Sequence, residues 1–174
     1  MLRLLAVVAL VAALAALATF AGCSKRSGEP TMFTGRTLSN NEVVLASNGA
    51  LTGKLNYAEV NSEWLAWAYA DFRRELSAGQ FGVVKWDNKS QCTLFASAFE
   101  VYCQKRYFAQ SFHSGTVADG IAVGTRWYKV GPTMGHAVNM IITERGIVDF
   151  EPQSGRFVAL NQDQISSSFM KKFD

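Results

Sequence analysis

Hydrophobic and polar positions divide the chain into an apolar start, a polar stretch and a region with regular periodicity. Residues 4–21 are almost entirely apolar, whereas residues 24–53 are rich in Ser, Thr, Asn and Gly. This polar composition is typical of a flexible tether, in which residues 42–46 could add a short strand. From Lys54 onward the periodicity predicts a folded domain that spans residues 54–174.

The first elements of this domain are a predicted strand and a predicted helix. Residues 54–60 alternate as a strand does, and Asn61 or Ser62 then caps a helix that ends before Gly79. Large apolar side chains recur along this helix at helical spacing: Trp64, Ala68, Phe72 and Leu76. We expect this stripe to face the hydrophobic core.

A second helix is predicted over residues 92–104, where only Glu100 is charged. A helix that is apolar nearly all round lies at the centre of a domain. After a polar loop over residues 110–120 come three segments typical of strands, residues 121–130, 136–143 and 146–152, joined by glycine-containing turns. Residues 160–173 then predict a short surface helix or strand. Helices first and antiparallel strands after them predict an α+β fold.

The apolar start has the pattern of a secretory signal, with Arg3 ahead of the apolar run and small residues before Cys23. "TFAGC" resembles the lipobox of bacterial lipoproteins. This resemblance implies a signal peptide over residues 1–22, lipidation of Cys23 and a tether over residues 23–53. An uncleaved anchor and plain secretion are the alternatives.

Acyl chains on Cys23 would hold the protein on a lipid bilayer, which is its first expected partner. The expected location is the bacterial cell envelope. Ser24, where an Asp would indicate inner-membrane retention, favours an outer-membrane lipoprotein facing the periplasm or the surface.

Charge and composition exclude several classes of function. The formal net charge is only +3 at pH 7, which gives no electrostatic case for nucleic acid as a partner. Two His and three Cys at these spacings match no zinc pattern. We therefore expect neither a metal site nor another cofactor.

Two cysteines, Cys92 and Cys103, lie eleven positions apart on the second predicted helix. Eleven helical residues span about 16 Å, whereas a disulfide needs Cα atoms within about 7 Å, so both thiols are expected to be free. Cys103 is interpreted as a packing residue. Cys92 lies in the first helical turn, where unpaired N–H groups favour a thiolate and could form half of an oxyanion hole. It is either a nucleophile or a second packing residue.

Of the two histidines, His113 lies in a polar loop and is interpreted as solvated. His136 opens a strand, where it is either a structural residue or the base that a thiol nucleophile requires. Its orienting partner should lie on the adjacent strand. Asp149, Glu151 and Gln153 share one face there by two-residue alternation, although they could equally form a solvent-facing edge.

A cysteine at the start of a buried helix, followed by "GHAVN" and then "EPQ", resembles the papain-like superfamily of cysteine peptidases. The resemblance covers about residues 54–170. It is closest to the C-terminal protease domain of the fairy-ring mushroom agglutinin and its bacterial and phage relatives. It implies an α+β papain-like fold, with N-terminal helices and a buried nucleophile helix packed on a small antiparallel sheet.

The same resemblance implies a triad of Cys92, His136 and Glu151. Asp149 is the alternative orienting residue, and Gln153 is a polar support. The backbone N–H of the nucleophile would stabilise the oxyanion together with one of three side chains: Gln91, Asn88 or Trp86. The segment "SQCT" differs from the acidic "DCDD" of many relatives and is similar to the "GQCT" of cell-wall amidases.

Together these patterns predict a lipid-anchored envelope thiol hydrolase that cleaves a peptide or amide bond. The expected substrate is a protein or a peptidoglycan peptide. The alternative is a catalytically inactive papain-like lipoprotein that acts as a binding module in the envelope. Its role would be complex assembly, exclusion or a phage-related process, with an envelope protein as a possible partner.

Overall fold

The structure is a computed structural model that describes residues 28–80, 92–114 and 118–174, with no side-chain detail for residues 112–114. Several predicted features lie outside the described residues: the signal peptide over residues 1–22, Cys23, Trp86, Asn88, Gln91 and the side chain of His113. Among the described residues, no helix is both long enough and apolar enough to cross a membrane.

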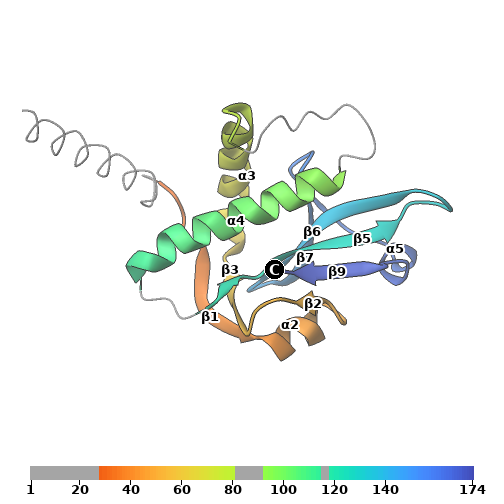
Figure 1. The fold of residues 1–174 in the computed structure, drawn as a ribbon, viewed down its shortest axis with the longest axis horizontal. Coiled ribbons are helices and arrows are strands. Elements are labelled where there is room, and N and C mark those ends of the chain that lie inside the picture. The colour runs from red at the N-terminus through yellow and green to blue at the C-terminus, as the bar shows by residue number, and fades with distance from the viewer. Residues whose placement is uncertain (1–27, 81–91, 115–117) are drawn as a thin grey trace, which may run out of the picture.

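A β-sheet forms the centre of the described part of the molecule (Figure 1). Its strands are β1 (Phe33–Ser39), β2 (Leu51–Thr52), β3 (Asn56–Val60), β4 (Gly120–Ile121), β5 (Val123–Lys129), β6 (Gly135–Thr143), β7 (Gly146–Glu151), β8 (Arg156–Val158) and β9 (Met170–Phe173). Strand β6 pairs with β5 and β7 in antiparallel register, whereas β3 pairs with β4 and β6 in parallel. The sheet is therefore mixed and larger than the small antiparallel sheet we expected.

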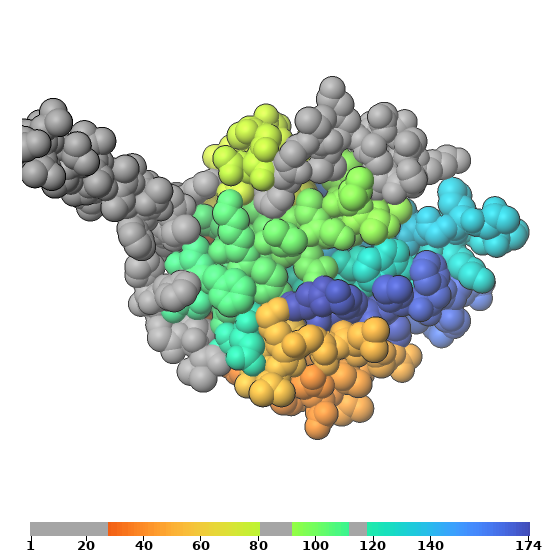
Figure 2. Space-filling view, in the orientation of Figure 1, coloured from red at the N-terminus to blue at the C-terminus, as the bar shows by residue number. Residues whose placement is uncertain are grey.

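Four helices are described: α2 (Asn40–Ala46), α3 (Ser62–Ser77), α4 (Cys92–Ser114) and α5 (Gln162–Ser166). Helices α3 and α4 pack on one face of the sheet around a core rich in aromatic side chains. Helix α2 and strand β2 cover a smaller core on the other face. Figure 2 shows the same layers, with α4 in green above β9 in blue and the α2–β2 region in orange below.

The segment predicted to be a tether is folded from residue 29 onward. Strand β1 pairs with β3, and α2 begins with a capping box in which Ser39 and Glu42 bond to each other's backbone N–H groups. Residues 42–46, predicted as a possible strand, are therefore helical. Before β1, the buried Glu29 forms an ion pair with Arg106 of α4. These contacts make the segment part of the domain.

Helix α3 confirms its prediction. Asn61 is the N-cap, and its side chain accepts a hydrogen bond from the Glu63 N–H. Gly79 has φ +74°, the left-handed conformation that often follows a helix end. Three of the four stripe residues, Trp64, Ala68 and Phe72, are buried and the fourth is partly buried.

Helix α4 continues ten residues beyond the predicted end, so the predicted loop over residues 110–120 is partly helical. The Tyr107 hydroxyl donates to the Ala118 carbonyl, and Gln110 donates to Glu29, which anchors these last turns. Cys92 and Cys103 are both free and buried, as predicted. Strands β5, β6 and β7 also match their predictions, and the C-terminal segment contains both α5 and β9.

Candidate functional site

The start of α4 meets the start of β6 at one helix–sheet junction. Cys92, the first residue of α4, packs with Ala96 and Ala137 in a small buried cluster that Trp127 borders. Ala137 directly follows His136 in β6. The structure therefore brings the two predicted site residues to the same junction from segments far apart in the sequence.

Hydrogen bonds from the sheet hold the first turns of α4 in place. The buried side chain of Asn139 donates to the Ala96 carbonyl at 2.9 Å and to the Gly124 carbonyl at 3.2 Å. The indole N–H of Trp127 donates to the Thr93 hydroxyl at 3.3 Å. Because these donors lie on adjacent, paired strands, the helix start is fixed relative to His136.

His136 is paired with Glu151, as predicted. Its Nε2 atom is in close contact with the Glu151 carboxylate at the end of β7. The backbone N–H of Gln153 donates to the other carboxylate oxygen at 3.2 Å. On the neighbouring strand, Tyr128 packs edge-on to the imidazole with ring centroids 5.6 Å apart. The imidazole is thus oriented by a carboxylate and an aromatic ring.

Asp149, the alternative orienting residue, does not contact His136. Arg126 Nε donates to its carboxylate at 2.9 Å, and burial raises the pKa of Asp149 above its ordinary value. This residue therefore belongs to a separate ion pair. Gln153 supports Glu151 through its backbone, whereas its side-chain Nε2 is buried and has no hydrogen-bond partner among the described residues.

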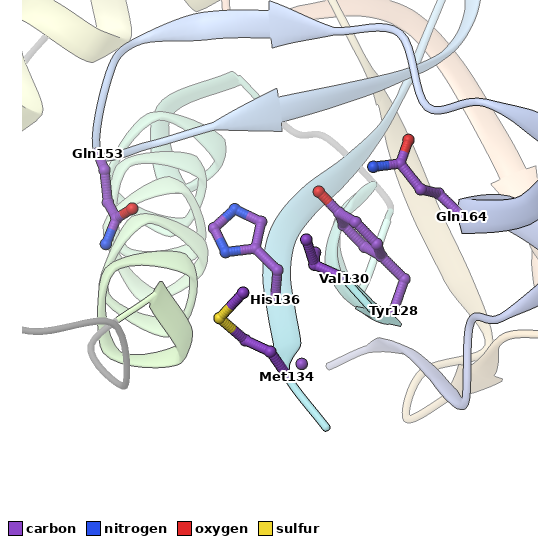
Figure 3. A pocket seen from close by; sticks show the side chains of 7 residues that line it. Tyr128, Val130, Met134, His136, Gln153 and Gln164 are labelled. Carbon is purple, nitrogen blue, oxygen red and sulfur yellow. The ribbon is translucent and has the colours of Figure 1, made fainter. Parts of the chain in front are cut away.

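A pocket of about 360 Å³ opens beside His136 (Figure 3). It is lined by Tyr128, Val130, Met134, Gly135, His136, Gln153 and Gln164. Burial raises the pKa of Tyr128 to about 12, so its phenol is neutral at physiological pH. The pocket therefore combines apolar walls with several neutral hydrogen-bonding groups.

Sequence reasoning did not single out Tyr128, Met134 or Gln164 as site residues. Tyr128 could have been identified from the register of the β5–β6 hairpin, which places it opposite His136. The signal for Gln164 is its position three residues after Asn161, a capping-box spacing that predicts a helix start.

The remaining predicted site residues are limited by what the structure describes. Trp86, Asn88 and Gln91 lie outside the described residues, so their contribution to an oxyanion site stays a prediction. Within the described ranges, no group of three or more His, Cys, Asp or Glu side chains could hold a metal ion.

Comparisons with known proteins find similar solved structures only. No family model matches the chain, and neither does any curated protein. A complex of PSL1a with E64 has a TM-score of 0.56 at 14% identity, covering 79% of this chain and 50% of that one. Polyporus squamosus lectin bound to the human-type influenza-binding epitope Neu5Acα2-6Galβ1-4GlcNAc has a TM-score of 0.55 at 13% identity, covering 79% of this chain and 49% of that one. At this identity the similarity shows the fold alone, over about half the length of the matched chains.

These findings correct the expected family and function. The matched structures are lectin chains, where the sequence led us to expect papain-like cysteine peptidases. The predicted thiol-hydrolase function is corrected on the same ground, and so is the papain-like identity of its catalytically inactive alternative. The comparisons also give no support to a palmitoylated lipoprotein or an outer-membrane location.

Proposed function

We propose that this domain binds an extended peptide at the pocket beside His136. The observation that carries the proposal is the end of β6. The pairing of β6 with β7 begins at Asn139, so on that side residues 135–138 have no strand partner among the described residues. A strand end of this kind offers backbone groups to which a peptide can add as a further strand.

Gly135 makes the backbone at this strand end accessible. The residue is exposed, and a Cβ atom added there would meet nothing closer than the Phe169 ring at 3.6 Å. A peptide can therefore approach the backbone of Gly135 without displacing a side chain. Because backbone hydrogen bonds are independent of the peptide's sequence, they supply general affinity, and the pocket supplies selectivity.

The side chains around this strand end fit an amide-rich ligand. Tyr128, Val130 and Met134 provide apolar surface, and the His136–Glu151 pair provides a polar anchor. We propose Cys92, His136 and Glu151 as the site residues. In this arrangement Cys92 packs against Ala137, next to His136 in the chain, and the Glu151 carboxylate holds the imidazole through Nε2.

A glycan is the second candidate ligand, favoured by the lectin structure that holds a bound trisaccharide. An aromatic wall and side-chain amides also suit a sugar, whose faces are apolar and whose hydroxyls need hydrogen-bonding partners. The described chain corresponds to only half of that lectin. The peptide is therefore the first candidate, because it is argued from this chain's own strand end.

Fluorescence anisotropy with the full chain distinguishes the two ligands. One probe is a fluorescein-labelled pool of random hexapeptides, and the other is fluorescein-labelled Neu5Acα2-6Galβ1-4GlcNAc. We expect the hexapeptides to bind and His136→Gln, which keeps a side chain able to hydrogen-bond Glu151, to weaken binding. Phe108→Ala, a matched exposed change on α4 away from the pocket, should have no effect.

If the trisaccharide binds and the hexapeptides do not, the ligand of this pocket is a glycan and not a peptide. Binding of neither probe, or peptide binding that His136→Gln leaves unchanged, would overturn the proposal.

A further inference from the structure

Gln164 lies on the opposite side of the pocket from Gln153, with His136 and Tyr128 between them (Figure 3). It belongs to α5, a helix whose start is closed by a complete capping box. The Asn161 side chain accepts from the Gln164 backbone N–H at 2.9 Å, and Gln164 Oε1 accepts from the Asn161 backbone N–H at 2.9 Å. The capping box therefore fixes the carboxamide of Gln164 before any ligand is bound.

The capping box uses the oxygen of this carboxamide and leaves its two N–H donors for another partner. Figure 3 shows the carboxamide directed toward the pocket, on the side of Tyr128. The hydrogen bond to Oε1 holds the whole carboxamide in position. Its N–H donors therefore lose little conformational freedom when they bind a ligand. Gln164 is thus prepared to donate to an acceptor in the pocket.

Apolar side chains at the tip of the β5–β6 hairpin form the wall next to this donor. Val130 and Met134 are 37% and 40% exposed, and the Val130 N–H donates to the Met134 carbonyl at 2.7 Å, which closes the tip. Both side chains line the pocket together with Gln164. This part of the pocket therefore presents an apolar wall that ends in a hydrogen-bond donor.

We infer that Gln164 selects, in the bound peptide, a side chain with an aliphatic stem and a terminal carboxamide, which is glutamine. The stem packs on Val130 and Met134, and the terminal oxygen accepts a hydrogen bond from Gln164 Nε2. This inference rests on the proposed peptide binding at the same pocket.

The test compares two acetylated, amidated hexapeptides that differ only at one central position, Gln against norleucine. The side chains have similar length, but only Gln carries the terminal acceptor. Isothermal titration with the full chain is expected to give about fivefold tighter binding of the Gln peptide, the effect of one added hydrogen bond.

Gln164→Glu separates recognition from helix capping. Glutamate keeps the oxygen that accepts the Asn161 N–H, since Glu and Gln serve equally at this position of a capping box. It loses both N–H donors, so the preference for the Gln peptide should disappear while the melting temperature stays near that of the wild type. Gln162→Glu adds the same charge on α5 at an exposed position outside the pocket and should keep the preference.

Equal affinities of the wild type for the two peptides would overturn the inference, whether or not a variant folds. A preference that persists in Gln164→Glu would also overturn it. In both cases the proposed function survives, because the peptides still bind. Absence of binding by both peptides would instead count against the proposed function itself.

Discussion

Glu100 should make the stability of this domain fall as the pH rises toward neutrality. Its side chain lies on α4 against β5 and is 8% exposed. The Thr125 hydroxyl donates to Oε2 at 2.7 Å, but Oε1 is buried and has no hydrogen-bond partner among the described residues. Burial raises the pKa of Glu100 from 4.5 to about 7, the Thr125 hydrogen bond opposes this rise, and the nearby Asp174 adds to it.

The size of the effect follows from linkage between proton binding and folding. Because the folded state holds the proton more tightly than the unfolded chain, the contribution of Glu100 to stability is complete below about pH 4.5. It is lost as the pH rises through about 7. At about 1.4 kcal/mol per pKa unit, the loss amounts to about 3 kcal/mol. Glu100→Gln cannot ionise, so this loss should be absent from the variant.

The assay is urea unfolding followed by tryptophan fluorescence at a series of pH values between 4 and 8.5. The free energy of unfolding of Glu100→Gln relative to wild type should increase by about 3 kcal/mol across this range. Glu63→Gln, at an exposed position in the first turn of α3, controls for the loss of one acidic group. A stability difference between Glu100→Gln and wild type that stays constant with pH would refute the reasoning.

Two further predictions concern the junction between α4 and the sheet. Asn139→Ala removes the hydrogen bond to the Ala96 carbonyl of α4 and the one to the Gly124 carbonyl of β5, and it should cost about 1–3 kcal/mol in the free energy of unfolding, measured with urea. An unchanged unfolding midpoint would contradict this. Cys92 should be alkylated by iodoacetamide before Cys103, because Cys103 is fully buried and burial raises the pKa of its thiol well above the ordinary value. Mass spectrometry of tryptic peptides reports the order, and earlier labelling of Cys103 would show that α4 packs differently.

Local sequence patterns predicted α3 and the three strands after residue 120. The α3 stripe could be located because its buried residues repeat at the period of a helix. Strands β5 and β6 are buried along most of their length without alternation, and they could be located as short apolar runs bounded by turn residues. Strand β1 could not, since Leu38 is its only buried residue and the rest of the strand shows no alternation. The last turns of α4 depend on contacts with Glu29, which lies far away in the sequence.

The sequence also predicted part of the candidate site: it narrowed the partner of His136 to two residues, but it did not identify Gln164. Alternation along β7 placed Asp149 and Glu151 together as candidates for the partner of His136. It could not choose between them, because the choice depends on Arg126, a side chain from a non-adjacent strand that pairs with Asp149. Gln164 reaches the pocket through the packing of α5 beside β5, which no local pattern encodes.

Chemical-shift mapping of the ¹⁵N-labelled full chain during titration with the random hexapeptide pool tests the central proposal most directly. Peptide binding at the end of β6 predicts that the backbone amide signals of Gly135, His136 and Gln153 move first and furthest. A separate pocket lies along α4, where Val101 and Phe108 are among its lining residues, and the signals of these two residues should stay in place. Shifts confined to α4, or none at all at the start of β6, would contradict a peptide-binding site beside His136.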